Sequence, residues 1–366
     1  MQKRYRQKRL LAAIIAQLAL VSTAQAELKL QTFQEKLDGA PVQIYIVSDD
    51  GNGAGVEWVS APLEKSYPAA GQALPELSSR LGLGVAVNAN FYREDKPGEQ
   101  DPIGLTIHEG RVLSTPNSYY PSVGVINGKL EWDNVRLQGE VEVVANGKTH
   151  REKICRFNGR ATSGCASLWL GKIPAGLKNT VFITADGSGP AIGRKSYPLQ
   201  SDASHAWALQ WPNGAIASGA TTVAITLKLR GERLGDKWEM ANEAVSGSHM
   251  LSTKKTFPSL ARSWAMARQP RTLTGVDGDG HPFVAVFDGR RDTSRGVSIR
   301  GAWEFLKKRI KAQWALNLDG GGSTTLLHDG RLVNKPTDGY PRAIAIGWGA
   351  RTRAITTEPE ASPKAE

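Results

Sequence analysis

Short runs in which apolar and polar residues alternate recur along most of the chain, and glycines or other turn residues separate them. A period of two is typical of β-strands, because successive side chains of a strand point to opposite faces of a sheet. The pattern predicts strands at 28–34, 42–47, 84–90, 141–147, 180–187, 221–230, 282–289 and 342–349. No repeat of fixed period relates these runs.

Helical patterns are fewer, and the two best candidates are residues 71–82 and 299–314. In the second candidate, Trp303, Leu306 and Ile310 recur at the spacing of one helix face, and the lysines between them would face solvent. We therefore expect an α+β fold: one strand-rich catalytic domain with a few helices and an active site in loops at strand ends.

The organisation of the chain follows from where these patterns are strong or weak. The domain is expected to span residues 27–350, with weak signals at 139–235 that indicate a long excursion or a small subdomain. Residues 351–366 are polar and contain proline, so we expect a disordered tail there.

Residues 1–26 have the order of a secretory signal peptide: a basic start, a short apolar run and small residues at Ala24 and Ala26. An uncleaved membrane anchor is the alternative, although the apolar run is short for a membrane span. No other stretch is apolar enough to cross a bilayer. We expect a protein that is secreted to the periplasm or outside the cell, without stable membrane insertion after cleavage.

The composition is that of a globular chain, with 40% hydrophobic and 22% charged residues. Its net charge of +11 falls to +6 when the five basic residues of the leader are removed. The remaining charge fits a sugar-phosphate or other anionic glycan substrate, and we expect no nucleic-acid partner.

The only two cysteines, Cys155 and Cys165, flank a short loop rich in Gly, Ser and Asn. In an oxidising compartment such a pair is expected to form a disulfide that closes the loop. Two free structural thiols are the alternative. A metal site would need more ligands than this loop offers.

Three consecutive glycines follow the apolar run that ends at Asp319, and the next apolar run, 324–330, has the pattern of a strand. Glycines allow positive φ and a close approach of a ligand to the backbone, whose N–H groups can then bind an anion. A tight connection capped by the aspartate is the simpler alternative. The whole turn consists of Asp319, Gly320, Gly321, Gly322, Ser323 and Thr324.

Other predicted strands also end in polar clusters. Arginine suits phosphate oxygens, asparagine suits sugar hydroxyls, and an aromatic ring can stack on a sugar. Each single residue could equally be a surface or structural group. The six histidines show no metal-ligand spacing. The clusters are Asn88, Asn90 and Tyr92; Arg268 and Arg271; Asp288, Arg290 and Arg291; and Asn334, Asp338 and Arg342.

The order and spacing of several of these motifs resemble the phosphodiester glycosidase family. They are NANFY, PIGL with HEGRVL, QPRTLTGVDGDG, VFDGRR, ALNLDGGGSTTL and GRLVNKPTDGYPRAIAIG. The resemblance covers most of residues 84–349 and is strongest from Arg271 onward. It implies a hydrolase that cleaves a sugar-1-phosphodiester to free sugar and a phosphomonoester.

Such chemistry needs stabilisation of the phosphate charge and activation of water. Asp319 or Asp288 would be the catalytic base if the C–O bond breaks. If the P–O bond breaks, the same two aspartates could hold a divalent cation, the only cofactor that we consider. The candidate residues for binding the sugar are Asn88, Asn90 and Tyr92. The candidate residues for binding the rest of the substrate, chiefly its phosphate, are Arg271, Arg290, Gly320, Gly321, Gly322, Ser323, Thr324 and Arg342.

Three function classes remain open on the sequence. The first is an exported phosphodiester glycosidase acting on an envelope or extracellular glycoconjugate. The second is a non-catalytic protein that binds envelope glycan or assists exopolysaccharide assembly, for which two carboxylates beside arginines would have no use. The third is a metal-dependent phosphodiesterase with no sugar requirement, and sugar-free diesters would distinguish it.

Overall fold

The computed structural model describes residues 27–49, 55–64, 67–171, 173–184, 189–201, 206–212, 220–253 and 263–352. The predicted signal peptide and nearly all of the predicted tail lie outside the described residues. Among the described residues, no helix combines the length and the apolar character that crossing a bilayer requires.

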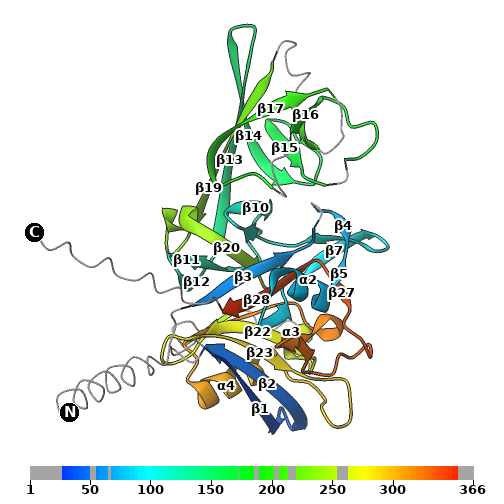
Figure 1. Cartoon of the computed structure of the whole chain (residues 1–366), viewed down its shortest axis with the longest axis vertical. Helices are drawn as coiled ribbons and strands as arrows, with labels where there is room; N and C mark the ends of the chain where they lie inside the picture. Colours follow the sequence, from blue (N-terminus) through cyan, green and yellow to red (C-terminus); the bar gives the residue numbers. More distant parts are fainter. Residues whose placement is uncertain are drawn as a thin grey trace, which may run out of the picture.

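The lower part of the molecule in Figure 1 contains a six-stranded sheet that is buried on both faces. In strand β23, Phe283, Ala285 and Phe287 pack in one apolar cluster with the helix α4, while Val284 and Val286 pack in another with the neighbouring sheet. Burial on both faces explains the continuous apolar run in the sequence. The sheet order is β1 (Leu28–Leu37), β2 (Ala40–Asp49), β23 (Pro282–Phe287), β22 (Arg271–Val276), β24 (Trp314–Asn317) and β21 (His249–Ser252).

The predicted helices are confirmed as α2 (Leu74–Leu81) and α4 (Ile299–Ile310). Helix α4 begins at the N-cap Ser298, whose hydroxyl accepts a hydrogen bond from the Gly301 N–H. Its buried face packs against the six-stranded sheet through contacts such as Phe305 on Phe287, with ring centroids 5.8 Å apart.

A five-stranded sheet covers the other face of the six-stranded sheet, and helix α2 packs in the same core. The indole N–H of Trp348 donates to the Thr274 hydroxyl at 3.2 Å, which joins the two sheets. The strand order is β26 (Arg331–Leu332), β25 (Leu326–His328), β6 (Val85–Asn88), β28 (Ile346–Thr352) and β3 (Val56–Pro62). The strand predicted after the glycines is confirmed as β25.

A third sheet lies between this body and a closed barrel at the top of Figure 1. The barrel has its own apolar core, in which Val141, Trp207 and Leu227 are almost completely buried. The third sheet runs β10 (Arg111–Ser114), β9 (Thr106–His108), β20 (Ala241–Ser246), β11 (Ser122–Ile126) and β12 (Lys129–Asp133). The barrel runs β13 (Val135–Ala145), β14 (Lys148–Phe157), β15 (Cys165–Trp169), β18 (Ala206–Gln210), β16 (Thr180–Thr184), β17 (Gly193–Gln200) and β19 (Thr222–Gly231).

The prediction of an α+β fold is wrong, because the molecule is mostly β, with 56% strand and 10% helix. The barrel strands occupy the segment, 139–235, whose sequence pattern was weak. Alternation is hard to recognise there because strands such as β14 are mostly polar and exposed. The remaining described elements are β4 (Ala69–Ala70), β5 (Gln72–Ala73), β7 (Tyr92–Lys96), β8 (Glu99–Pro102), β27 (Ala343–Ile344), α3 (Ser263–Met266), and the 3-10 turns η1 (Asp236–Met240) and η2 (Gly321–Ser323).

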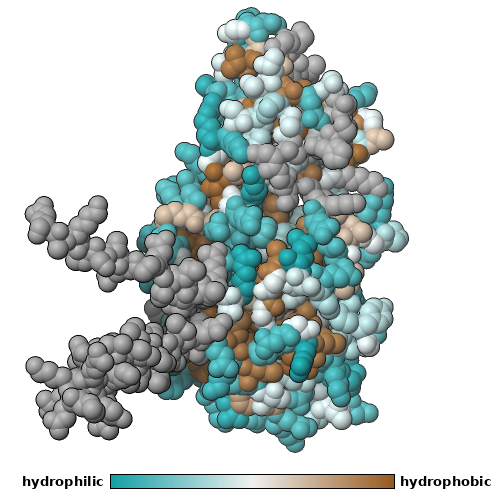
Figure 2. Space-filling view, viewed as in Figure 1, coloured by the Kyte–Doolittle hydropathy of each residue, from teal (hydrophilic) through white to brown (hydrophobic). Residues whose placement is uncertain are grey.

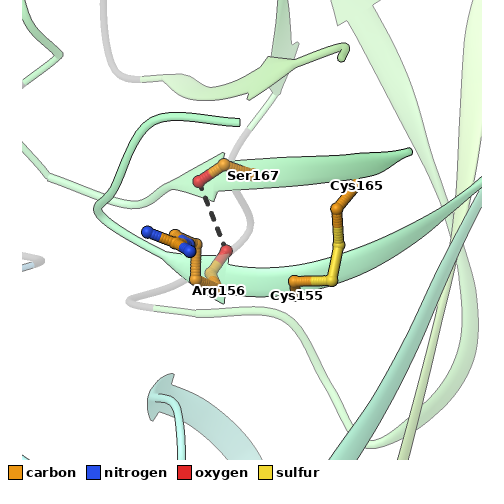
Figure 3. Close-up of a disulfide and its surroundings, with 4 residues drawn as sticks. All are labelled: Cys155, Arg156, Cys165 and Ser167. Atoms are coloured by element: carbon orange, nitrogen blue, oxygen red, sulfur yellow. Dashed lines mark hydrogen bonds between the residues drawn. A yellow bond between two sulfur atoms is a disulfide. The ribbon is translucent and has the colours of Figure 1, made fainter. Parts of the chain in front are cut away.

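Cys155 and Cys165 form the predicted disulfide, with their Cα atoms 5.8 Å apart. Figure 3 shows the bond joining the neighbouring strands β14 and β15 of the barrel, which run parallel. The Ser167 hydroxyl donates to the Arg156 carbonyl at 3.3 Å beside it. The disulfide therefore stabilises the barrel.

The surface of the face shown in Figure 2 is mostly hydrophilic, and the hydrophobic side chains visible there are concentrated over the lower sheets. This distribution matches the burial described above, with the aromatic and aliphatic side chains held between layers.

Candidate functional site

Asp288 and Asp319 follow strands β23 and β24, and both lie at the same end of the strands of the six-stranded sheet. Strand β22 lies between β23 and β24 and is antiparallel to both. The ends of β23 and β24 therefore both lie beside the first residue of β22, Arg271. This register brings Asp288 and Asp319, which are 31 positions apart in the sequence, to the same end of the strands.

The glycine turn after β24 is held by backbone hydrogen bonds on both sides. Asp319 donates its N–H to the Ala89 carbonyl at 2.8 Å, and Gly321 donates its own to the Pro270 carbonyl at 3.0 Å. Gly321 has φ +60, in the left-handed region that glycine adopts most readily. A side chain at Gly320 would lie against the Pro270 carbonyl, so this residue is a glycine for lack of space.

Two arginines lie directly over the other two glycines. A Cβ atom on Gly321 would be 3.0 Å from an Nη atom of Arg290, and one on Gly322 would be 2.1 Å from an Nη atom of Arg342. Because these positions have no side chains, there is room for the two guanidinium groups close to the backbone. The turn therefore has one positive charge over each of two adjacent glycines.

The Asp319 side chain lies within the field of Arg342, and the residue is partly exposed. Burial by the surrounding protein raises its pKa to about 6, although hydrogen bonding from Ser323 and Gly320 and the charge of Arg342 lower it. The Gly320 N–H donates to an Asp319 Oδ atom at 2.9 Å. A carboxyl with this pKa is mostly ionised at neutral pH and can still take up a proton, as a general base must.

Hydroxyl groups complete the surroundings of Asp319. Burial and then the charge of Asp319 raise the pKa of Tyr92, while hydrogen bonding to Arg342 and Ser323 lowers it. The phenol therefore stays protonated and can donate a hydrogen bond. The Thr324 hydroxyl is almost completely buried and has no hydrogen-bond partner among the described residues.

Asp288 lies at the same end of the strands, but its carboxylate already accepts hydrogen bonds from three groups. It accepts hydrogen bonds from Arg291 at 2.7 Å, from the Asn334 amide at 3.1 Å and from the Lys335 N–H at 3.3 Å. Only 1% of the residue is exposed. Burial raises its pKa, while the partner groups, Asn334 first, lower it. The arrangement makes Asp288 a link between the loops around 290 and 335.

Three of the predicted substrate-binding residues have their polar groups satisfied within the protein. Asn88 donates to the Asp319 carbonyl at 2.7 Å and accepts from Thr272 at 2.8 Å. Asn90 donates to the carbonyls of 103 and 105 and accepts from the N–H of residue 246. Arg271 donates to the carbonyls of 297 and 267, and its burial lowers its pKa to about 10. These residues position the site.

The structure thus brings together Asp319, Tyr92, Ser323 and Arg342 around the turn, with Arg290 on its other side. The sequence analysis named all five residues as candidates. Of the groups that hold the two arginines in place, the sequence pointed to Asp338, which accepts from Arg342 at 2.7 Å, but not to Gln269, which accepts from Arg290 Nε at 2.9 Å. Only the i,i+4 spacing of Asp338 and Arg342 was a usable signal in the sequence.

The group of side chains that could hold a cation lies elsewhere. Among the described residues, one oxygen or nitrogen atom each of Asp277, Asp279 and His281 lie within 4.8 Å of one another. These residues form the turn between β22 and β23, at the other end of the strands from Asp288 and Asp319. Asp277 accepts the N–H groups of residues 279 and 281 at 2.9 Å, so hydrogen bonds within the turn account for this arrangement.

Residues 179–351 match the sequence profile of the phosphodiester glycosidase family. The match includes every residue of the turn and both arginines above it, while Tyr92 precedes it. No curated protein matches the chain.

Two of three similar solved structures share the overall fold, at low sequence identity. A hypothetical protein from Synechocystis has a TM-score of 0.66 and 15% identity, with 91% of this chain and 64% of that chain covered. A Burkholderia pseudomallei K96243 protein, described as exported, has a TM-score of 0.66 and 18% identity over 86% of this chain and 75% of that chain. The catalytic domain of zebrafish N-acetylglucosamine-1-phosphodiester alpha-N-acetylglucosaminidase has 16% identity and a TM-score of 0.48 over 91% and 85%.

Proposed function

Because residues 179–351 are a phosphodiester glycosidase domain, we propose that this protein hydrolyses a sugar-1-phosphodiester to free sugar and a phosphomonoester. The observation that supports this most strongly is the turn at Asp319. It combines a carboxyl whose pKa is about 6 with the guanidinium groups of Arg290 and Arg342 on adjacent glycines.

The two arginines would hold the charged oxygens of the scissile phosphate. Arginine presents several N–H donors in a planar fork that matches phosphate oxygens. Arg342 keeps its position through Asp338, and Arg290 through Gln269. Positive charges that are fixed before the substrate arrives stabilise developing negative charge without a cost of reorganisation.

The reaction would proceed by cleavage of the bond between the anomeric carbon and oxygen. The leaving group is then a phosphomonoester, whose second pKa is about 6, so it departs without a strong acid. Asp319 would take a proton from the attacking water, whose oxygen bonds to the anomeric carbon. Tyr92 and Ser323 would donate hydrogen bonds to the sugar or the phosphate beside it.

We also propose that the protein acts outside the cytoplasm, on an envelope or extracellular glycoconjugate. The leader pattern of residues 1–26 and the Cys155–Cys165 disulfide support this location. Disulfides persist mainly in oxidising compartments. Intact mass of the protein from an envelope fraction tests it, and a chain that begins at Glu27 is expected.

The activity is tested with purified mature protein and a panel of sugar-1-phosphodiesters, with and without a chelator, in ¹⁸O-labelled water. We expect free sugar to be released, with the label in the sugar, and no release by Asp319→Ala. Label in the phosphate would mean P–O cleavage and would contradict the proposed role of Asp319.

Two results would replace the proposal with another function class. Turnover of a sugar-free diaryl phosphate without turnover of any sugar phosphodiester would indicate a phosphodiesterase. Binding of an anionic glycan without turnover of any diester would indicate a binding protein.

A further inference from the structure

An open pocket of about 790 Å³ lies between the loop around residue 290, the segment 266–268 and the start of helix α4. Arg290, which lies over Gly321, is one of its lining residues, so the pocket continues directly from the proposed phosphate position. The charged side chains that line it are Asp38, Arg268, Arg290, Arg291, Asp292 and Arg295.

The six charges differ in how far the protein already neutralises them. Arg291 is paired with Asp288 at 2.7 Å, and Arg295 with Asp292 at 2.8 Å. The other two arginines have neutral partners: Arg290 donates to the Gln269 side chain and Arg268 to the backbone carbonyl of Asp38 at 3.1 Å. Within the described part of the chain, neither forms an ion pair with a carboxylate.

Asp38, the remaining acidic group of the pocket, is also engaged. Its carboxylate accepts the N–H of Ser298 at 2.6 Å, at the start of helix α4. The negative charge therefore serves the helix terminus, where it is favourable. The side chains of Arg268 and Arg290 remain as the two positive charges in this pocket that lack a counter-charge.

We propose that the leaving group of the substrate carries a second phosphate, which Arg268 binds in this pocket. This inference rests on the proposed function. Arg290 contacts the scissile phosphate, and the chain beyond that phosphate passes over Arg290 toward Arg268. The ligand class is a sugar-1-phosphodiester whose other ester partner is itself anionic through phosphate.

The openness of the pocket agrees with this role. A polymer or a long leaving group has to leave the site toward solvent, and a pocket lined mainly by arginines favours an anionic chain over a neutral one. Two chemical sources share this feature. The second phosphate could be directly attached, as in a diphosphate, or could lie one sugar further along a repeating sugar-phosphate chain.

Three substrates with the same sugar test the inference: a methyl phosphodiester, a diphosphate ester and a two-repeat sugar-phosphate oligomer. For the wild-type protein we expect kcat/KM to be at least ~10-fold higher for a substrate with a second phosphate, an advantage that shrinks at high salt. The more favoured of the two arms identifies the source of the second phosphate.

Arg268→Ala is expected to lose this advantage and to keep kcat/KM on the methyl ester within about twofold, as expected for a contact that only the longer substrates make. The matched control is Arg309→Ala on helix α4, an exposed arginine that pairs with Glu35 at 2.7 Å. It should retain the advantage. A thermal melt of each variant separates a folding defect from lost recognition.

The outcomes distinguish this inference from the proposed function. Equal kcat/KM on all three substrates, or an advantage that survives Arg268→Ala, would overturn the second-phosphate site and leave the phosphodiester glycosidase activity standing. Failure to hydrolyse any of the three substrates would contradict the proposed function, and this inference with it.

Discussion

Strands β23 and β24 of one sheet both end in an Asp-Gly pair, yet the two turns have different roles. Asp288 is completely buried and saturated by Arg291, Asn334 and Lys335. Asp319 has a hydroxyl and a backbone N–H as its closest partners and keeps some exposure. The same Asp-Gly pair is therefore a structural carboxylate in one turn and a carboxylate suited to proton transfer in the other.

The difference arises from the residues that surround each carboxylate, some of which follow it in the chain and some of which come from other loops. At Asp288, an arginine three positions along the chain turns back and neutralises the charge. At Asp319 the following residues are glycines, and the nearby Arg342 gives its closest ion pair to Asp338. A carboxylate becomes reactive when its environment leaves it without a dedicated counter-charge.

The largest expected effect is the loss of turnover when Asp319 loses its charge. Asp319→Asn should lower kcat on a sugar-1-phosphodiester by about 10³-fold while the protein remains folded, because an amide cannot accept the proton. Glu304→Gln, the same change on the exposed face of α4, is the control and should be unaffected. A kcat within threefold of wild type for Asp319→Asn would remove this residue from the mechanism.

The corresponding change in the other turn should affect stability instead. Asp288→Asn breaks a buried ion pair and should lower the free energy of unfolding by about 3 kcal/mol. Its kcat per folded molecule should stay within about threefold of wild type. Urea denaturation measures the first quantity and a single-turnover assay the second.

Asp292→Asn is the control for that change, because it removes a partner from an Arg–Asp pair with the same spacing that is exposed to solvent. It should cost less than ~1 kcal/mol. Loss of turnover in well-folded Asp288→Asn would mean that both aspartates take part in the chemistry.

Alanine substitutions in the glycine turn should separate two effects: displacement of a nearby arginine side chain and strain in the backbone. Gly322→Ala places a methyl group where Arg342 lies, so kcat/KM should fall about 30-fold, or ~2 kcal/mol, with little change in stability, because a flexible side chain can move aside. Gly321→Ala adds the strain of φ +60 and should lose about 10-fold, with ~1 kcal/mol of stability.

Gly330→Ala provides the control for strain alone. This glycine has φ +70, and a Cβ atom there would meet nothing within 4 Å. Its stability should fall by ~1 kcal/mol with no change in kcat/KM. If Gly322→Ala behaved in the same way, the close approach of Arg342 would have no catalytic role.

The pH dependence is the smallest effect and reports on Asp319 directly. With its pKa at about 6, kcat/KM should rise roughly tenfold from pH 5 to a plateau above pH 7, because only the ionised carboxylate accepts a proton. A flat profile over this range would contradict the assignment of the base to Asp319.

The same pKa has a consequence for stability. Since the folded-state value lies above the ordinary value of 3.8, the folded protein binds the proton more tightly, and this stabilisation is lost as the pH rises through about 6. Asp319→Asn should therefore be more stable than wild type above pH 7, by about 3 kcal/mol, and equally stable below pH 3. Urea denaturation at the two pH values measures the difference.

Several features of the molecule could be predicted from the sequence because they depend on local patterns. Alternating runs predicted strands such as β2 and β23, and an apolar stripe predicted helix α4. The cysteine pair predicted its disulfide, and the Asp-Gly-Gly-Gly-Ser motif led to the phosphodiester glycosidase family. The strand, helix and cysteine signals each lie within about 20 consecutive residues, whereas the family resemblance rests on the order of several motifs over residues 84–349.

Only the tertiary structure decided which candidate residues face the site. Asn88, Asn90 and Arg271 have the residue types of substrate ligands, but their hydrogen bonds hold backbone carbonyls in place. The fold class was predicted wrongly for a related reason, since the middle of the chain closes into a barrel through pairings such as β13 with β19, some 90 residues apart.

The sequence by itself determined the strands, the glycine turn and the chemistry that the turn could support. The tertiary structure decided that Asp288 is paired with Arg291 and hydrogen-bonded by Asn334, while Asp319 has only Arg342 as a nearby positive charge in the part of the chain that the structure describes. The physical reason is that a carboxyl group acquires its pKa from burial and neighbouring charges. Those neighbours come from strands and loops that only the antiparallel register brings to one edge of the sheet.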